Sequence, residues 1–145
     1  MAENKKIKNA TPLEYDGISF KSKLEKMAYQ TLREKGFPVQ YEPRKFIIWE
    51  GFKPTVPFYN KDTITRELKL DNKKIINMTY SPDFIFYYNG YQVILEMKGM
   101  ENSVFPIKKK VFRKWLEEHE PKSIYFEIYT KRQLLQAIEI IKQLE

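Results

Sequence analysis

The chain has 145 residues, the size of one ordinary domain and too short for two independent cores. Hydrophobic residues make up 42% of it and aromatic residues 15%, so the chain can bury enough apolar surface to fold, which excludes a disordered protein. Lys and Arg number 26 against 19 Asp and Glu, and the net charge of +7 favours a polyanionic partner such as nucleic acid, although a basic surface can also serve solubility alone.

The residue inventory excludes several kinds of site. With no cysteine and one histidine, the chain offers no disulfide, thiolate metal site or cysteine nucleophile, and histidine-rich zinc sites have little support. No apolar run approaches the roughly 18 residues of a membrane span, and residues 1–10 are polar and lysine-rich with no signal region after them. We therefore expect no membrane partner and a reducing, cytoplasmic compartment.

The N-terminal part of the chain predicts an arm followed by a helix. We expect residues 1–14 to be a flexible arm ahead of a single domain that spans 15–145. Ser22 and Glu25 form a capping box that opens a helix, and Gly36 is a natural stop for it. The apolar residues of this helix recur at helical spacing and are Leu24, Ala28 and Leu32.

The next segment predicts one strand and an insertion. β-Forming residues predict a strand over residues 39–49, interrupted only by Pro43. Residues 51–73 have no clear pattern, and we expect them to be an insertion in the domain. Within them, Asp71-Asn72 marks either a hairpin turn or a loop.

The clearest element in the sequence is a β-hairpin. Residues 76–88 and 91–98 are both strongly β-forming, and Asn89-Gly90 joins them. This dipeptide is the strongest short-range hairpin signal, because both residues tolerate a positive φ.

Behind the hairpin, the sequence predicts a helix, a strand and a final helix. The helix covers residues 106–119, the strand covers 123–129, and Thr130 caps the last helix. The residues expected to face the core from the first of these helices are Ile107, Val111, Trp115 and Leu116. A strand, a helix and a second strand form a parallel crossover, so we expect an α/β fold with a mixed sheet and helices on both faces.

The hairpin register brings ionisable residues together. A two-residue turn sets Tyr88 opposite Tyr91. Counting back along both strands from this pair, Asp83 lies directly opposite Glu96. Side chains alternate faces along a strand, so Lys98 projects from the same face as Glu96.

Two opposed carboxylates need a positive charge between them. Like charges at directly opposed positions are destabilising, and the neighbouring residues are almost wholly apolar, so these groups are expected to be buried. Hard oxygen ligands suit Mg²⁺ or Mn²⁺. Lys98 alone is the alternative source of counter-charge, in a cross-strand ladder of ion pairs.

These residues form a motif, Pro82-Asp83 followed by Glu96-Met97-Lys98. It resembles the signature of the PD-(D/E)xK nuclease superfamily, in which the acidic residue and the E-x-K triplet lie on adjacent strands of a hairpin. The resemblance extends over residues 15–115 and is strongest to small phage and prophage endonucleases similar to Holliday junction resolvases. It implies a restriction-endonuclease-like αβββαβ core, a mixed central sheet flanked by helices, and a bacterial or phage-infected host cell.

The same resemblance implies roles for single residues. Asp83, Glu96 and the main-chain carbonyl of Met97 would be ligands of a catalytic Mg²⁺, with Mn²⁺ as a possible substitute. Lys98 would orient or help deprotonate the attacking water. Glu25 would hold a second metal or orient a metal-bound water; its alternative role is to cap its own helix.

The resemblance and the charge pattern also imply partners. The cationic residues Lys108, Lys109, Lys110 and Arg113 would contact DNA phosphates, although a charge run is often only a solvated helix face. We expect the protein to be an endodeoxyribonuclease selective for DNA structure, with DNA, possibly branched, as its partner. A homodimer would suit a junction with two scissile strands. The alternatives are an RNA nuclease and a basic nucleic-acid-binding scaffold that needs no catalysis.

Overall fold

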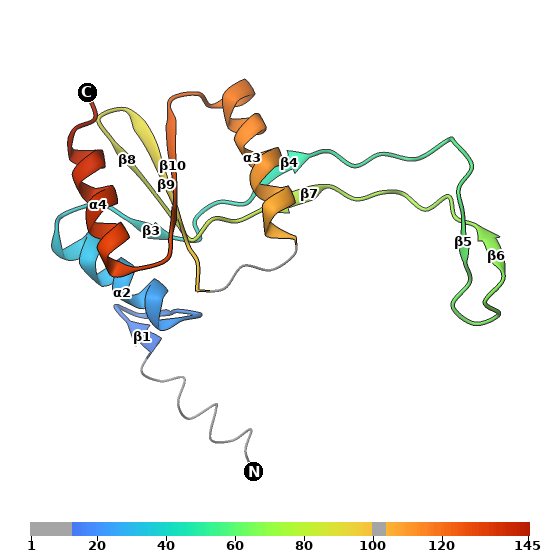
Figure 1. Cartoon of the computed structure of the whole chain (residues 1–145), viewed down its shortest axis with the longest axis horizontal. Coiled ribbons are helices and arrows are strands. Elements are labelled where there is room, and N and C mark those ends of the chain that lie inside the picture. The colour runs from blue at the N-terminus through green and yellow to red at the C-terminus, as the bar shows by residue number, and fades with distance from the viewer. Residues whose placement is uncertain (1–12, 100–103) are drawn as a thin grey trace, which may run out of the picture.

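A computed structural model describes residues 13–99 and 104–145, and it shows an α/β body from which one long segment projects (Figure 1). A four-stranded sheet with the strand order β10-β9-β8-β3 forms the centre of the body. Its strands are β3 (Gln40–Tyr41), β8 (Phe84–Tyr88), β9 (Tyr91–Met97) and β10 (Ser123–Ile128). Most of the predicted N-terminal arm, residues 1–12, lies outside the described residues. The short strands β1 (Glu14–Tyr15) and β2 (Ile18–Ser19) pair with each other.

The β8–β9 hairpin has the predicted turn and register. Asn89 and Gly90 both have positive φ, 51° and 82°, as a two-residue turn of this kind requires. Tyr88 pairs with Tyr91, and the ladder continues without a bulge to Phe84 and Leu95. The prediction of an uninterrupted register is therefore confirmed.

The predicted crossover and the mixed sheet are also confirmed. Strand β10 runs parallel to β9, and the chain between them forms helix α3 (Phe105–His119). Helices α2 (Lys23–Glu34) and α4 (Lys131–Lys142) pack on one face of the sheet, and α3 packs on the other (Figure 1). Two hydrophobic clusters, one on each face, make up the core.

The predicted helix ends agree with the capping contacts. The Ser22 hydroxyl accepts a hydrogen bond from the Glu25 amide at 3.1 Å, and α2 ends just before Gly36, whose φ is 88°. The Thr130 hydroxyl accepts one from the Gln133 amide, also at 3.1 Å.

Two predicted strands are each divided in the structure. Residues 39–49 contain β3 and a second strand that leaves the central sheet, and residues 76–88 contain β8 and a second strand that does the same. These two additional strands, β4 (Phe46–Trp49) and β7 (Met78–Tyr80), pair with each other. The breaks fall at Pro43 and Pro82, because a proline has no N–H to donate to a ladder.

The prediction of which α3 residues face the core is wrong at one position. Ile107 is 58% exposed, whereas Leu116 is buried and Val111 and Trp115 are half-buried. The helix begins at Phe105, whose buried side chain sets the phase of the apolar stripe, and the prediction began the helix one residue too late. The buried residues of α3 are Phe105, Phe112 and Leu116.

Residues 51–76 form the projecting segment, called the projection below. Two extended chains leave the β4–β7 pair and end in a small hairpin (Figure 1). Its strands are β5 (Tyr59–Lys61) and β6 (Leu68–Leu70). The chain reverses at Asp62, whose carboxylate accepts hydrogen bonds from the amides of Ile64 and Thr65. Asp71-Asn72 is therefore a loop and not the hairpin turn.

No helix in the described residues is long and apolar enough to cross a bilayer.

Candidate active site

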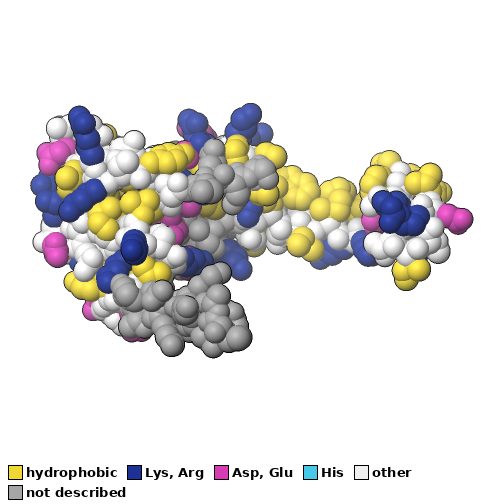
Figure 2. Space-filling view, turned by 60° about the horizontal axis from the view of Figure 1, so that its bottom comes forward, with side chains coloured by type: hydrophobic (Ala, Val, Ile, Leu, Met, Phe, Trp, Pro, Cys, Tyr) yellow, Lys and Arg dark blue, Asp and Glu magenta, His cyan; other side chains and the backbone are white. Residues whose placement is uncertain are grey.

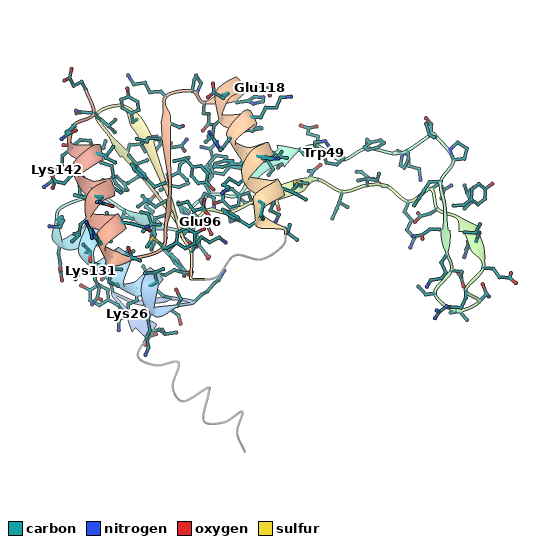
Figure 3. All side chains as sticks on the ribbon, viewed as in Figure 1. Lys26, Trp49, Glu96, Glu118, Lys131 and Lys142 are labelled. Carbon is teal, nitrogen blue, oxygen red and sulfur yellow. The ribbon has the colours of Figure 1, made fainter. Side chains whose placement is uncertain are left out.

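The structure brings Asp83, Glu96 and Lys98 together at one end of the β8–β9 hairpin. Asp83 directly precedes β8, Glu96 is the penultimate residue of β9, and Lys98 directly follows β9. All three residues are less than 10% exposed. Phe84 and Leu95, their neighbours in the ladder, pack beneath α2 and α4, so Asp83 and Glu96 face the α3 side. Glu96 is labelled in Figure 3.

Asp83 is fixed through both its main chain and its side chain. Its carbonyl oxygen accepts a hydrogen bond from the Glu42 amide at 2.7 Å, which extends the ladder from β3. Its carboxylate Oδ2 accepts a hydrogen bond from the Met97 amide, also at 2.7 Å. The residue is therefore held between two neighbouring strands, and its carboxylate lies beside the peptide that links Glu96 to Met97.

Tyrosine hydroxyls fix the Glu96 carboxylate. The hydroxyl of Tyr80 donates to Glu96 Oε1 at 2.6 Å and lies 2.9 Å from the hydroxyl of Tyr125. These tyrosines come from β7 and β10, so two strands outside the hairpin position this carboxylate.

Lys98 is held close to Glu96 by its own main chain and by an aromatic ring. Its amide donates to the carbonyl of Ile128 at 2.7 Å, which continues the β9–β10 ladder by one residue. Its Nζ lies 3.6 Å from Glu96 Oε2 and 3.8 Å from the centre of the Phe105 ring. A cation over a ring face is attracted by the ring quadrupole, so Phe105 helps to hold the ammonium group beside Glu96.

Burial makes the two carboxylates costly to ionise. It raises the pKa of Asp83 to about 8, aided by the negative charge of Glu96 and opposed by the hydrogen bond from Met97. Burial also raises the pKa of Glu96, although Tyr80 and Lys98 oppose the shift. An added positive charge at this position would therefore be strongly favoured.

Glu25 approaches the same region from α2. Its carboxylate Oε1 accepts hydrogen bonds from the Tyr41 hydroxyl at 2.6 Å and from the Lys21 amide at 3.3 Å. It thus accepts from the amide one residue before the N-cap Ser22 and not from the Ser22 amide that a capping box would use, and its negative charge contributes to the raised pKa of Asp83. Glu25 can therefore make its contact at the start of α2 and still lie near Asp83 and Glu96.

The donor set fits a hard divalent cation that is only partly bound by side chains. Within residues 13–99 and 104–145, no group of three or more His, Asp or Glu side chains is arranged to hold a metal ion. Asp83 and Glu96 offer two carboxylates, and the carbonyl of Met97 would be a third protein oxygen. Mg²⁺ commonly takes one or two carboxylates and completes its shell with water and substrate oxygens.

The basic residues of α3 lie in different environments. Lys109 pairs with Glu127 at 2.7 Å, which neutralises much of its charge locally. Lys110 and Arg113 are exposed and line a groove of about 640 Å³ between α3 and β10. Lys108 is half-buried. Of the four predicted phosphate contacts, Lys110 and Arg113 are the most accessible.

Sequence reasoning missed the aromatic residues around the acidic pair. Tyr80, Tyr41 and Phe105 contact Glu96, Glu25 and Lys98 respectively, Tyr125 contacts Tyr80, and none of them is assigned a role from the sequence. Tyr80 carried a usable signal, because it lies only three residues before Asp83 in the sequence. The other three are indistinguishable in sequence from core aromatics.

The fold and site therefore define an α/β protein with a buried acidic pair and a lysine at the end of a hairpin. The chain belongs to the family described as "Protein of unknown function (DUF1064)", which matches residues 5–133. No curated protein and no solved structure matched the chain.

Proposed function

We propose that this protein is a metal-dependent endonuclease of the PD-(D/E)xK type that hydrolyses DNA phosphodiester bonds. The observation that carries the proposal is the convergence of Asp83, Glu96 and Lys98, all buried, on one face of the hairpin. A fold gains nothing from burying two like charges together unless a ligand or metal uses them.

The order of elements supports the same class. The central sheet and its helices follow the chain order α2, β3, β8, β9, α3, β10, which agrees with the αβββαβ core expected of that superfamily. The strands that carry the acidic pair, β8 and β9, lie in the middle of this sheet.

The proposed mechanism assigns a task to each residue. Asp83, Glu96 and the Met97 carbonyl would hold Mg²⁺, which supplies Lewis-acid stabilisation to the phosphate and acidifies the attacking water. Lys98, held 3.6 Å from Glu96, orients that water and stabilises negative charge that develops on the phosphate. Glu25 would orient a water or support a second cation.

The surface beside the site supports a polyanionic substrate. The groove between α3 and β10 carries four basic residues, Lys109, Lys110, Arg113 and Lys114, against three acidic ones, Glu117, Glu120 and Glu127, and the net charge of the chain is +7. Selectivity for branched DNA, as in Holliday junction resolvases of phage or prophage type, is the part of the proposal that rests on motif resemblance alone.

The test is cleavage of a panel of branched, flap and linear DNA, with matched RNA, in Mg²⁺ and in EDTA. We expect Mg²⁺-dependent cleavage of DNA, and a loss of at least about 100-fold in Glu96→Gln and Lys98→Met. Glu139→Gln is the matched control, since this exposed carboxylate on α4 pairs only loosely with Lys142, at 3.9 Å.

Three outcomes would contradict the proposal. They are the absence of metal-dependent cleavage of any nucleic acid, full activity in both variants, and cleavage of RNA alone. Binding that depends on salt but ignores Mg²⁺, without cleavage, would favour the basic scaffold.

A further inference from the structure

The projection exposes many large apolar side chains to solvent. Val56, Ile64, Leu68 and Ile76 are each more than three-quarters exposed. Hydrophobic side chains follow one another along the extended part of the projection and gather again at its tip (Figure 2). No residue of the projection belongs to either hydrophobic cluster of the body.

The hairpin at the tip has one apolar face and one polar face. Tyr59 pairs with Leu70, and Lys61 pairs with Leu68, so these side chains share a face, and it is mainly apolar. The remaining pair, Asn60 and Lys69, lies on the other face. This alternation is typical of a sheet with one side packed against protein, yet all six residues are exposed.

The projection exposes apolar surface on the scale of a protein interface. Nine large apolar residues of the projection are between 41% and 87% exposed, and at roughly 100 Å² for a whole side chain they offer on the order of 600 Å². A standard interface buries about 800 Å² per partner, and an isolated two-stranded hairpin is only marginally stable in water. The projection therefore needs a protein surface that covers it.

The body carries a matching apolar groove beside the root of the projection. It measures about 570 Å³ and lies between β4 and α3. Its apolar lining residues are Ile47, Ile48, Trp49, Val111 and Trp115, and Glu50, Lys110, Lys114, Glu118 and His119 line it as well. Ile47 and Trp49 are 46% and 42% exposed. The projection of the same chain points away from this groove and cannot cover it (Figure 1).

We propose that the covering partner is a second copy of this chain, in a two-fold dimer in which each projection lies across the β4–α3 groove of the other copy. Two-fold symmetry buries both projections and both grooves at once and leaves no open end. From Phe52 to Tyr59 the chain spans up to about 23 Å at ~3.3 Å per residue, enough to lie along a helix of the length of α3 in a second copy.

A second copy explains the apolar face better than nucleic acid does. The projection holds six Lys and Arg against three Asp and Glu, but a basic surface does not account for apolar side chains turned toward water. The dimer does not depend on the proposed nuclease activity.

The first experiment measures the mass of the full chain by light scattering after gel filtration, near 50 µM. The wild type is expected at twice its chain mass of 17.5 kDa, and Leu68→Asp with Leu70→Asp at one chain mass. Asn60→Asp with Lys69→Asn adds the same charge to the opposite face of the hairpin, and this control is expected to remain a dimer. A monomeric wild type, or a dimer that survives the two leucine substitutions, would overturn the proposal.

The second experiment locates the contact with introduced cysteines, since the chain has none of its own. Leu68→Cys protein is mixed with Glu118→Cys protein, whose cysteine lies at the groove, and is then oxidised. A disulfide between the two proteins is expected, and Leu68→Cys mixed with Glu139→Cys, on α4, is the control. Equal cross-linking in both mixtures, or association that requires added DNA, would overturn the proposal.

Discussion

Among single residues, Tyr80 shows how the site depends on groups that carry no charge. Its hydroxyl donates to Glu96 and touches Tyr125, so it links β7 and β10 to the carboxylate on β9. Partners of this kind orient metal ligands, and removing one typically costs ten- to a hundred-fold in metal affinity or activity.

We therefore predict that Tyr80→Phe weakens catalysis without unfolding the protein. The variant keeps the buried ring but lets the Glu96 carboxylate turn, so the Mg²⁺ concentration for half-maximal cleavage should rise by about tenfold or more. A magnesium titration of cleavage measures this, with Tyr87→Phe, on an exposed side chain of β8, as the control. An unchanged magnesium dependence in Tyr80→Phe would show that the hydroxyl does not position Glu96.

Asp83 leads to a prediction about pH and stability. Because burial raises its pKa from 3.8 to about 8, the folded state binds a proton more tightly than the unfolded chain does. The resulting stability is complete below about pH 4 and is lost as the pH rises through about 8. In EDTA, the free energy of unfolding should therefore be lower at pH 8.5 than at pH 5.5 by about a few kcal/mol. The melting temperature should be lower at pH 8.5 as a result.

Asp83→Asn supplies the control, since an amide does not ionise. Its melting temperature should change less with pH than that of the wild type, and Mg²⁺ should stabilise the wild type most at high pH. A wild type and variant with the same pH dependence would contradict the raised pKa.

Among the elements, α3 has two roles, because it covers one face of the sheet and borders the site. Phe112 is fully buried, and its ring contacts those of Phe46, Tyr80 and Tyr125. The same helix supplies Phe105 to Lys98. Packing on this side of the sheet therefore also holds the site.

We predict that Phe112→Ala destabilises the protein strongly and Ile107→Ala hardly at all. Removing a buried phenylalanine costs about 3–5 kcal/mol, whereas a change at an exposed position usually stays within about 0.5 kcal/mol. Urea denaturation of the two variants measures the difference. Similar losses in both would mean that the helix faces the core with the stripe predicted from sequence, which includes Ile107.

Local signals explain which elements sequence reasoning could predict. The Asn89-Gly90 turn fixes the hairpin register by itself, and Ser22 and Gly36 mark the ends of α2, so these features were right. The partners of a strand beyond a proline depend on the whole sheet. For that reason only Pro43 was predicted as an interruption, the break at Pro82 was not, and the separate β4–β7 pair was not expected.

The residues of the candidate site likewise fall into those that the sequence could predict and those that it could not. Asp83 and Glu96 followed from counting along two strands, and the register in the structure brings them together. The hydroxyls of Tyr41 and Tyr125 come from strands far away in sequence, and only the folded chain identifies their partners.

In the whole molecule, exposed basic residues lie on both sides of the central sheet. The groove with Lys110 and Arg113 lies on the α3 side of the sheet, while Lys131 and Arg132 are exposed at the start of α4, on the opposite side. The projection contributes the largest apolar surface. If a nucleic acid follows the groove beside the proposed active site, these two basic pairs should contribute unequally to binding.

We predict that Lys110→Ala with Arg113→Ala lowers the salt dependence of DNA binding more than Lys131→Ala with Arg132→Ala does. Each phosphate contact with duplex DNA contributes about 0.9 to the slope of log affinity against log salt concentration, so the first pair should reduce the slope by roughly 1 to 2. Binding of a duplex, measured in EDTA to prevent cleavage and at several salt concentrations, gives both slopes. Equal reductions would mean that the net charge attracts DNA without a defined path, and a larger effect at α4 would place the nucleic acid on the face away from Asp83 and Glu96. Because both substitutions remove two positive charges from exposed helix positions, the comparison separates a DNA path from net charge alone.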